Sequence, residues 1–275
     1  MSIVAAMNYP FTDRVALVVG ASRGIGAGTA LAFARSGAAV VLAARDEQAL
    51  AAVAAEITAI GGRALVVPTD VTDAAAMQDL VEQSLAAYGR LDFAFNNVTA
   101  GPLPAPLADL DVDEFDTGIA ANVRGTFLGM KHQIPAMLAS GGGAIVNMAS
   151  IAGVRGTANL GAYVAGKAGI IGLTKVAALD YADQGIRVNV VAPGPILTHH
   201  LRAAGEQAQQ GAARSTPMGR IGTVDEVANA VLWLCSEQAA FITGVALPID
   251  GGQSAGVKPP LLYRPGQPLG SAARP

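Results

Sequence analysis

The sequence feature that most constrains the fold is an uninterrupted apolar run that leads into a glycine-rich turn. Residues 14–20 read Arg-Val-Ala-Leu-Val-Val-Gly, without the polar alternation of a half-exposed strand, which is typical of a strand buried on both faces of a parallel sheet. The turn contains Gly20, Gly24 and Gly26, and a helical pattern follows at residues 27–36. Glycines between a strand and a helix allow a tight turn and a close approach to a pyrophosphate at the helix N-terminus. The segment therefore predicts a dinucleotide-binding βαβ unit.

Apolar and helical segments alternate along the rest of the chain. Further strands are expected at residues 39–43, 64–67, 91–95, 144–148, 186–191 and 245–249, and further helices at residues 46–60, 73–88, 112–138, 161–183 and 224–236. This rhythm implies right-handed crossovers and one parallel sheet covered on both faces. The predicted fold is α/β: a single-domain, doubly wound, Rossmann-type sheet of about seven strands over residues 1–252, with a Pro- and Gly-rich tail at 253–275.

Two of these helices have distinctive residues. The helix at 112–138 contains Pro135, which predicts a bend or a first-turn position because proline lacks a backbone donor. The helix at 46–60 is expected to be buried through one apolar face, formed by Leu50, Val53, Ile57 and Ile60.

The regular pattern loosens in residues 195–222, where we expect an exposed segment with one short helix. This segment follows the sixth strand and so lies over the carboxyl edge of the sheet, where ligands bind in this architecture. It is the expected substrate lid. His199 and His200 lie within it, but an adjacent pair cannot easily direct both rings to one ion, and no cysteine or acidic cluster joins them. No metal site is therefore predicted.

Tyr163 and Lys167 are the strongest candidates for chemistry. If the segment is helical, their i,i+4 spacing places the phenol and the ammonium one turn apart on the same face. A cation held there lowers the pKa of the phenol from about 10, because an opposite charge favours the ionised form. The pair then predicts an acid/base that exchanges a proton near neutral pH.

Composition excludes several classes of partner. The net charge of −3 provides no basic surface for nucleic acid or an anionic membrane. Cys235 is the only cysteine, so no intrachain disulfide is possible and a buried thiol is expected. No segment reaches about 18 unbroken apolar residues, and residues 1–14 lack the basic region and apolar core of a signal peptide. A chain with 52% hydrophobic and 14% charged residues is expected to bury apolar surface in an oligomer, and a cytoplasmic location is expected.

The glycine spacing, taken with Tyr163-x-x-x-Lys167, resembles the classical short-chain dehydrogenase/reductase family, and in particular its 3-oxoacyl reductase-like and ketoreductase members. The resemblance covers about residues 12–252. Other matching positions follow the expected strands or lie in the long helix: Asp70-Val71, Asn96-Asn97, Asn122, Ser150, Pro193-Gly194-x-Ile196-x-Thr198, and the stretch from Gly219-Arg220 to Gly251-Gly252.

The resemblance implies a catalytic set of four residues. Tyr163 would donate or accept the proton at the carbonyl or alcohol oxygen, Lys167 would lower its pKa and hold the nicotinamide ribose, Ser150 would hydrogen-bond the substrate oxygen, and Asn122 would position a water that links Lys167 to solvent. The implied cofactor-binding residues are Gly20, Ser22, Arg23, Gly24, Ile25, Gly26, Arg45, Asp70, Val71, Asn97, Val98, Tyr163, Lys167, Pro193, Gly194, Ile196 and Thr198.

The end of the second strand bears on the choice of cofactor. An acidic residue there would bind the adenosine ribose and repel a 2′-phosphate, whereas an arginine would bind it. Here Arg45 stands with no acid before Asp46, and Arg23 lies in the glycine-rich turn. Two guanidinium groups able to bind a phosphate favour NADP(H) over NAD(H). The alternative is that Arg45 is a solvated surface residue.

The chain departs from the family pattern at two places. Val98-Thr99 replaces the usual Ala-Gly, so the loop and the pocket near the nicotinamide are expected to be reshaped, and a positive φ at Thr99 would cost stability. Val19 replaces the threonine that is common before the first glycine. Neither change touches the four catalytic candidates.

The function predicted is the reversible reduction of a ketone to a secondary alcohol by hydride transfer with NADP(H), by a homotetramer that acts on a small molecule. One alternative is an NAD-dependent secondary-alcohol, polyol or steroid dehydrogenase. Another is a non-catalytic dinucleotide-binding sensor, which has no reason to keep Ser150, Tyr163 and Lys167 together. Pocket walls that suggest a mostly apolar, medium-sized ketone are expected at Val98, Gly101, Val154, Arg155, Leu160 and Pro195.

Overall fold

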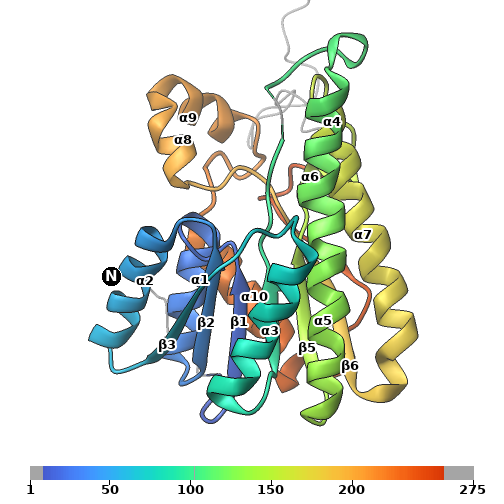
Figure 1. Cartoon of the computed structure of the whole chain (residues 1–275). Helices are drawn as coiled ribbons and strands as arrows, with labels where there is room; N and C mark the ends of the chain where they lie inside the picture. Colours follow the sequence, from blue (N-terminus) through green and yellow to red (C-terminus); the bar gives the residue numbers. More distant parts are fainter. Residues whose placement is uncertain (1–8, 102, 257–275) are drawn as a thin grey trace, which may run out of the picture.

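A single parallel sheet organises the structure (Figure 1). The computed structural model describes residues 9–101 and 103–256; most of the N-terminal stretch 1–14 and of the tail 253–275 lies outside them. Within these described residues, seven strands occur in the order β3-β2-β1-β4-β5-β6-β7, and every neighbouring pair is parallel. Their bounds are β1 Val15–Val19, β2 Ala39–Ala44, β3 Arg63–Pro68, β4 Phe93–Asn96, β5 Gly143–Met148, β6 Ile186–Pro193 and β7 Ala246–Ile249. The predicted α/β fold class is confirmed.

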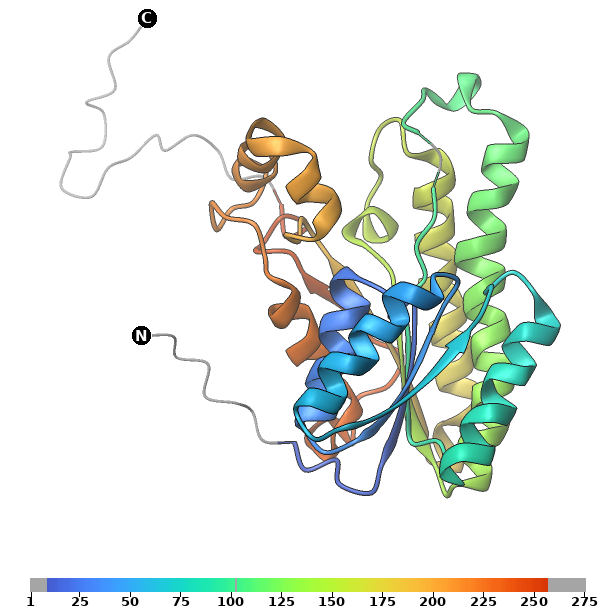
Figure 2. The ribbon, with the colours of Figure 1, turned by 60° about the vertical axis from the view of Figure 1, so that its left-hand side comes forward.

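Helices cover both faces of this sheet (Figures 1 and 2). The longer helices are α1 Gly24–Arg35, α2 Glu47–Ala59, α3 Ala74–Tyr88, α4 Val112–Ile119, α5 Gly125–Ala139, α7 Gly161–Tyr181, α9 Gly205–Arg214 and α10 Val224–Cys235. Short segments are η1 Leu107–Asp109, η2 Ala120–Arg124, α6 Ile151–Val154, η3 Ala182–Gln184, α8 His199–Ala203 and η4 Glu237–Ala239. Helices α1, α2 and α10 pack on one face, and α3, α5 and α7 pack on the other.

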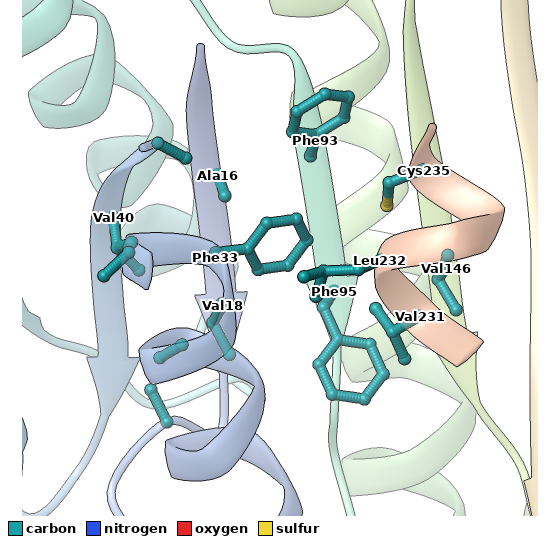
Figure 3. Packing of buried hydrophobic residues seen from close by; sticks show 14 of the residues in the cluster. Ala16, Val18, Phe33, Val40, Phe93, Phe95, Val146, Val231, Leu232 and Cys235 are labelled. Atoms are coloured by element: carbon teal, nitrogen blue, oxygen red, sulfur yellow. The ribbon is translucent and has the colours of Figure 1, made fainter. Parts of the chain in front are cut away.

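The apolar run of β1 is buried on both sides because successive side chains alternate between the two faces of the sheet. Ala16 and Val18 belong to the cluster that contains Phe33 and Val231, whereas Leu17 belongs to the opposite cluster. Figure 3 shows the first cluster, with α1 and α10 meeting over β1 and β4. Each face of β1 packs against a different hydrophobic core, so every position of this central strand is apolar.

The strand order changes direction between β1 and β4. The chain runs outward from β1 through β2 to β3, then returns to pair β4 with the other side of β1. The loops that leave β1 and β4 consequently diverge and open a crevice at the carboxyl edge of the sheet, which is where ligands bind in open α/β sheets.

Some local features differ from the prediction. The helical region expected at 112–138 is confirmed, since α4, η2 and α5 follow one another without a break, but the π-helical turn at η2 was not predicted and Pro135 lies inside α5, beyond its first turn. The segment at 195–222 contains two helices, α8 and α9, instead of one, and the short α6 was not predicted. Ile60 is the C-terminal cap of α2 and is 48% exposed, because the helix ends before its face can turn back to the core.

Within the described residues, one helix is long and apolar enough to cross a membrane by length and composition, at Gly161–Gln184. This segment includes α7, which packs Ala162, Ile170 and Ala177 against the molecule. Burial along this side accounts for much of its apolar character.

The two isoleucines at the end of α2 allow a matched test of this packing. Ile57→Ala should lower the free energy of unfolding by about 2–5 kcal/mol, because Ile57 is fully buried and its truncation leaves a cavity. Ile60→Ala should cost less than about 1 kcal/mol, because the side chain is half exposed. Urea unfolding monitored by circular dichroism measures both values. Equal losses would contradict the placement of the two side chains.

Candidate active site

The crevice at the switch point is a cavity of about 1170 Å³. Its walls come from the loops after β1, β2, β3, β4 and β6, from the end of β5, and from α7 and α8. Among the catalytic and cofactor-binding candidates named from the sequence, only Gly26 and Asn122 do not line it. Among the expected pocket walls, Val98 lines it, whereas the others do not: Gly101, Val154, Arg155, Leu160 and Pro195. Lining residues that were not predicted are Ala44, Asp46, Thr69, Thr72, Thr99, Ala100, Thr117, Ala120, Ala121, Met148, Ala149, His199 and His200. Most of these adjoin predicted residues in the sequence; only Thr117, one turn before Ala121 on the same helical stretch, lies apart from them.

The glycine-rich turn packs so closely against neighbouring backbone that there is no room for a Cβ at Gly20 or Gly26. A Cβ at Gly26 would lie 2.0 Å from the carbonyl oxygen of Gly20, and one at Gly20, where φ is +76°, would lie 2.2 Å from the carbonyl oxygen of Asn97. The Asn97 side chain donates from Nδ2 to the Gly20 oxygen at 3.0 Å. No side chain caps the N-terminus of α1, whose first turn begins at Gly24 on the cavity wall. The turn therefore fits a pyrophosphate, which the backbone N–H groups there can bind.

Tyr163 and Lys167 lie one turn apart in the first part of α7, and the lysine Nζ is 5.6 Å from the centroid of the phenol ring. Ser150 follows β5 and is the N-cap of α6, where its Oγ accepts a hydrogen bond from the backbone N–H of Ala152 at 3.1 Å. All three residues line the cavity. A cap that only accepts leaves the hydroxyl hydrogen of Ser150 able to donate to another group.

Lys167 is fully buried, which is rare for a lysine. Its Nζ donates to the carbonyl oxygens of Val98 at 2.6 Å and Met148 at 3.1 Å. An ammonium has three N–H donors, so one remains for a further acceptor. Burial lowers the pKa of this amine to about 7, because desolvation disfavours the charged form. Lys167 can therefore release and take up a proton near neutral pH.

Asn122 lies in the π-helical turn η2 and is fully buried. Its Nδ2 donates to the carbonyl oxygens of Ala100 at 2.5 Å and Gly118 at 2.9 Å. Its Oδ1 is buried and has no hydrogen-bond partner among the described residues. An acceptor in this position, beside the helix that carries Lys167, matches a group that binds a water molecule.

The unusual Val98-Thr99 pair is accommodated without strain. Neither residue has a positive φ, so the backbone there does not require glycine. Val98 is buried and supplies the oxygen that Lys167 contacts, while Thr99 is exposed and lines the cavity. Further along the chain, Ala105 N donates a hydrogen bond to Asn159 O at 3.0 Å, which joins this region to the segment before α7. The substitution therefore changes the pocket surface and leaves the lysine contacts in place.

The end of the cavity beyond β2 and β3 contains both cations and carboxylates. Arg23 donates from Nη2 to Asp46 Oδ2 at 2.9 Å, and both side chains are about half exposed. Hydrogen bonds from the backbone N–H and hydroxyl of Thr72 hold the pKa of Asp70 below its usual range, and Arg45 lowers that pKa further. The two arginines thus lie in the same part of the cavity, one of them already paired with an acid.

His199 and His200 line the same cavity, with ring centroids 3.9 Å apart. Within residues 9–101 and 103–256, no three histidine, cysteine, aspartate or glutamate side chains form a group that could hold a metal ion.

A doubly wound parallel sheet, with a glycine-rich turn at its switch point and a buried lysine below a tyrosine, defines an oxidoreductase of the Rossmann type. The family model described as "Enoyl-(Acyl carrier protein) reductase" matches residues 20–254. The chain belongs to the short-chain dehydrogenase/reductase family, in its classical form. Members of this family use NAD(P).

Named relatives act on secondary alcohols or on the corresponding carbonyl compounds. The chain is 44% identical over 245 residues to an A-factor type gamma-butyrolactone 1′-reductase of Streptomyces virginiae, covering 88% of this chain and 95% of the relative. It is 41% identical over 249 residues to a cyclohexanol dehydrogenase of an Acinetobacter species, covering 90% and 98%. The crystal structure of levodione reductase superposes with a TM-score of 0.86 at 35% identity, covering 90% of this chain and 100% of that chain. This protein is therefore an oxidoreductase acting on CH–OH or C=O groups.

The buried amine should make stability depend on pH. The pKa of Lys167 is about 7 in the folded chain, against about 10.4 when the lysine is solvated. Between these values the unfolded chain binds more protons than the folded chain, so raising the pH favours the folded state. Wild type should therefore gain stability relative to Lys167→Met between pH 7 and about pH 9.

Urea unfolding at several pH values measures this difference. Lys175→Met, on the exposed side of the same helix, is the charge-matched control. Parallel profiles for wild type and Lys167→Met would show that the buried amine does not titrate in this range.

Proposed function

We propose that this oxidoreductase reversibly reduces a ketone to a secondary alcohol with NADP(H), using Ser150, Tyr163, Lys167 and Asn122. The observation that carries the proposal is the fully buried Lys167, bound to two carbonyl oxygens beside the Tyr163 ring at the wall of a large cavity. Burying a lysine is costly and has no structural advantage over an apolar residue, so its retention points to chemistry.

The protein residues manage the substrate oxygen and its proton. A bound nicotinamide would supply or accept the hydride at carbon. Tyr163 donates the proton to the oxygen in reduction and accepts it in oxidation, and the amine of Lys167 lies one turn away on the same helix. Ser150 donates its free hydroxyl hydrogen to the same oxygen, since its own acceptor site is used by Ala152.

The proton then needs a route from the phenol to solvent. Lys167 can exchange a proton near neutral pH because burial lowers its pKa to about 7. The unpartnered Oδ1 of Asn122 offers an acceptor for a water on the next step. The π-helical turn that contains Asn122 supports this role, since such turns often occur at functional sites.

Arg23 and Arg45 support the preference for NADP(H). Both line the adenosine end of the cavity, and both are exposed enough to reach a 2′-phosphate. The pairing of Arg23 with Asp46 favours the alternative, an NAD-dependent dehydrogenase, because a carboxylate near the ribose repels a 2′-phosphate. In the proposal, Arg23 exchanges Asp46 for the phosphate.

A cyclic, mostly apolar ketone is the proposed substrate class. The relatives include a cyclohexanol dehydrogenase and a cis-4-hydroxycyclohexanecarboxylate dehydrogenase of Sinomonas cyclohexanicum, 42% identical over 249 residues. A Cβ at Gly101 would lie 3.4 Å from the Tyr163 ring, so this glycine leaves room beside the phenol. Assaying alicyclic, linear and aromatic ketones with NADPH, and the matching alcohols with NADP⁺, tests the class.

The lid, the assembly and the location are also proposals. The base of the 195–222 segment is closed by a bridge between Ile196 and Gly222 and by the Arg220–Glu226 ion pair at 2.6 Å, which suits a lid that moves on fixed ends. Exposed Phe127 on α5, with Val176 and Leu179 on α7, supports a homotetramer built through these helices. A single domain over 1–252 and a cytoplasmic location complete the proposal.

Tyr163→Phe should reduce kcat by about 100-fold or more, because it removes the acidic proton and leaves the ring in place. Cofactor binding, followed by fluorescence titration, should remain nearly intact. Tyr181→Phe, at the other end of α7, is the matched control and should retain activity. Residual turnover above about one per cent in Tyr163→Phe would count against the general-acid role.

Substitutions at the adenosine end should separate the two cofactors. Arg45→Ala should raise the KM for NADPH at least about tenfold, as expected for loss of a charge-assisted hydrogen bond, and should leave the KM for NADH unchanged. Asp46→Asn should lower the KM for NADPH, since it frees Arg23 and can still cap α2. An unchanged NADPH constant in Arg45→Ala, or a large rise of the NADH constant in Asp46→Asn, would favour the NAD-dependent alternative.

A further inference from the structure

Two histidines at the base of the lid have no part in the proposed proton chemistry. His199 and His200 open α8 directly after Thr198, and both side chains face the cofactor cavity. Figures 1 and 2 show α8 and α9 together above the carboxyl edge of the sheet. The ring centroids of His199 and His200 are 3.9 Å apart. Within the described residues no group suited to a metal ion includes them, so their position requires another explanation.

The first of these histidines is close to the glycine-rich turn. The Cγ2 atom of Thr198 would lie 3.5 Å from a Cβ at Gly24, which places the start of α8 over the first turn of α1. Arg23, the residue before Gly24, acts electrostatically on His199. The uncapped N-terminus of α1 is where the turn fits a pyrophosphate. An imidazole at the start of α8 therefore lies near the part of the cavity where the turn fits a pyrophosphate.

We propose that His199 binds the pyrophosphate of the dinucleotide as an imidazolium, so that cofactor binding takes up a proton and couples the lid to the bound phosphates. The proposal rests on the dinucleotide binding that the proposed function requires. His199 becomes a cofactor-binding residue outside the set identified from the sequence.

The charges around His199 determine the direction of this coupling. Without a cofactor, slight burial and the neighbouring His200 and Arg23 lower the pKa of His199, so it is mostly neutral near pH 7. The other ionisable groups of the cavity lie on separate elements: Arg45, Asp46, Asp70, Tyr163 and Lys167. Asp46 is already paired with Arg23. A pyrophosphate therefore introduces negative charge where His199 otherwise meets cations, and this raises its proton affinity.

Proton uptake can be measured directly on the full-length protein. Binding of NAD⁺ is followed by isothermal titration calorimetry at pH 6.5 and pH 8, in two buffers with different ionisation enthalpies. NAD⁺ is the probe because it lacks the 2′-phosphate, a group that itself titrates near pH 6. In wild type we expect a fractional proton taken up per NAD⁺, and an affinity that rises as the pH falls. The rise reaches about tenfold for each unit by which binding raises the pKa.

Three variants separate a proton-binding role from a structural one. His199→Gln should lose the proton uptake and the pH dependence, while retaining weaker binding. His199→Arg should bind with wild-type affinity or better at pH 8 without taking up protons, since its charge is permanent. His200→Gln should still take up protons, which distinguishes the two rings. Because Lys167 also titrates near neutral pH, only the difference between wild type and His199→Gln is assigned to the histidine.

The outcomes distinguish this inference from the proposed function. Binding of NAD⁺ with no proton uptake in wild type, or with equal uptake in His199→Gln, would overturn the role of His199 and leave the proposed function intact. Absence of binding by both NAD⁺ and NADP⁺ would overturn both.

Discussion

The burial of Lys167 is the constraint on which the site depends. Its ammonium binds the carbonyl oxygens of Val98 and Met148, so one side chain joins α7 to the ends of β4 and β5. This requires α6 and η2 to approach α7 closely: a Cβ at Gly153 would lie 2.6 Å from the Lys167 carbonyl carbon, and one at Gly166 would lie 3.0 Å from Asn122 Cβ. Small residues on both sides of the lysine are therefore a condition of the chemistry, because a charged group in a dry site must keep its hydrogen-bond partners.

A buried polar network lies at the ends of β4 and β5, next in sequence to the segments that carry these two carbonyl oxygens. Asn96 and Gln133 exchange hydrogen bonds at 3.0 and 2.8 Å, Asn96 also donates to Asn147 at 2.9 Å, and Asn147 donates to Thr174 at 3.0 Å. These side chains come from β4, α5, β5 and α7, and all are buried. Their fully paired network fixes the strand ends one residue before Asn97 and Met148. The acceptor at Met148 is thus positioned by the interior, whereas Val98 lies two residues beyond Asn96, in the loop that lines the pocket.

The sequence predicted most of what depends on local pattern. The runs at 14–20 and 144–148 were apolar enough to be identified as buried strands, and the glycine spacing and the Tyr163–Lys167 spacing located the two ends of the cavity. The sequence did not predict the features that depend on contacts between segments far apart in the chain. Examples are the pairing of Arg23 with Asp46, the network around Asn147, and the π-helical turn at Asn122, none of which has a local signature. The helices α8 and α9 were underestimated because α8 spans only five residues and α9 contains alanine as its only apolar residue type.

The cationic side chains of the cavity differ in burial: Lys167 is fully buried, whereas Arg23 and Arg45 are exposed. Lys167 is dry, so its charge acts strongly over a short distance and its protonation responds to the oxygen chemistry beside it. Arg23 and Arg45 are exposed at the rim, where water and salt weaken the charge of each, so that strong binding there needs a multiply charged partner. Residues at the rim can therefore change with little effect on proton transfer. In the proposed mechanism, the pocket walls such as Thr99 can therefore differ without moving the group that handles the proton, which is consistent with relatives named for a lactone, a cyclohexanol and a levodione.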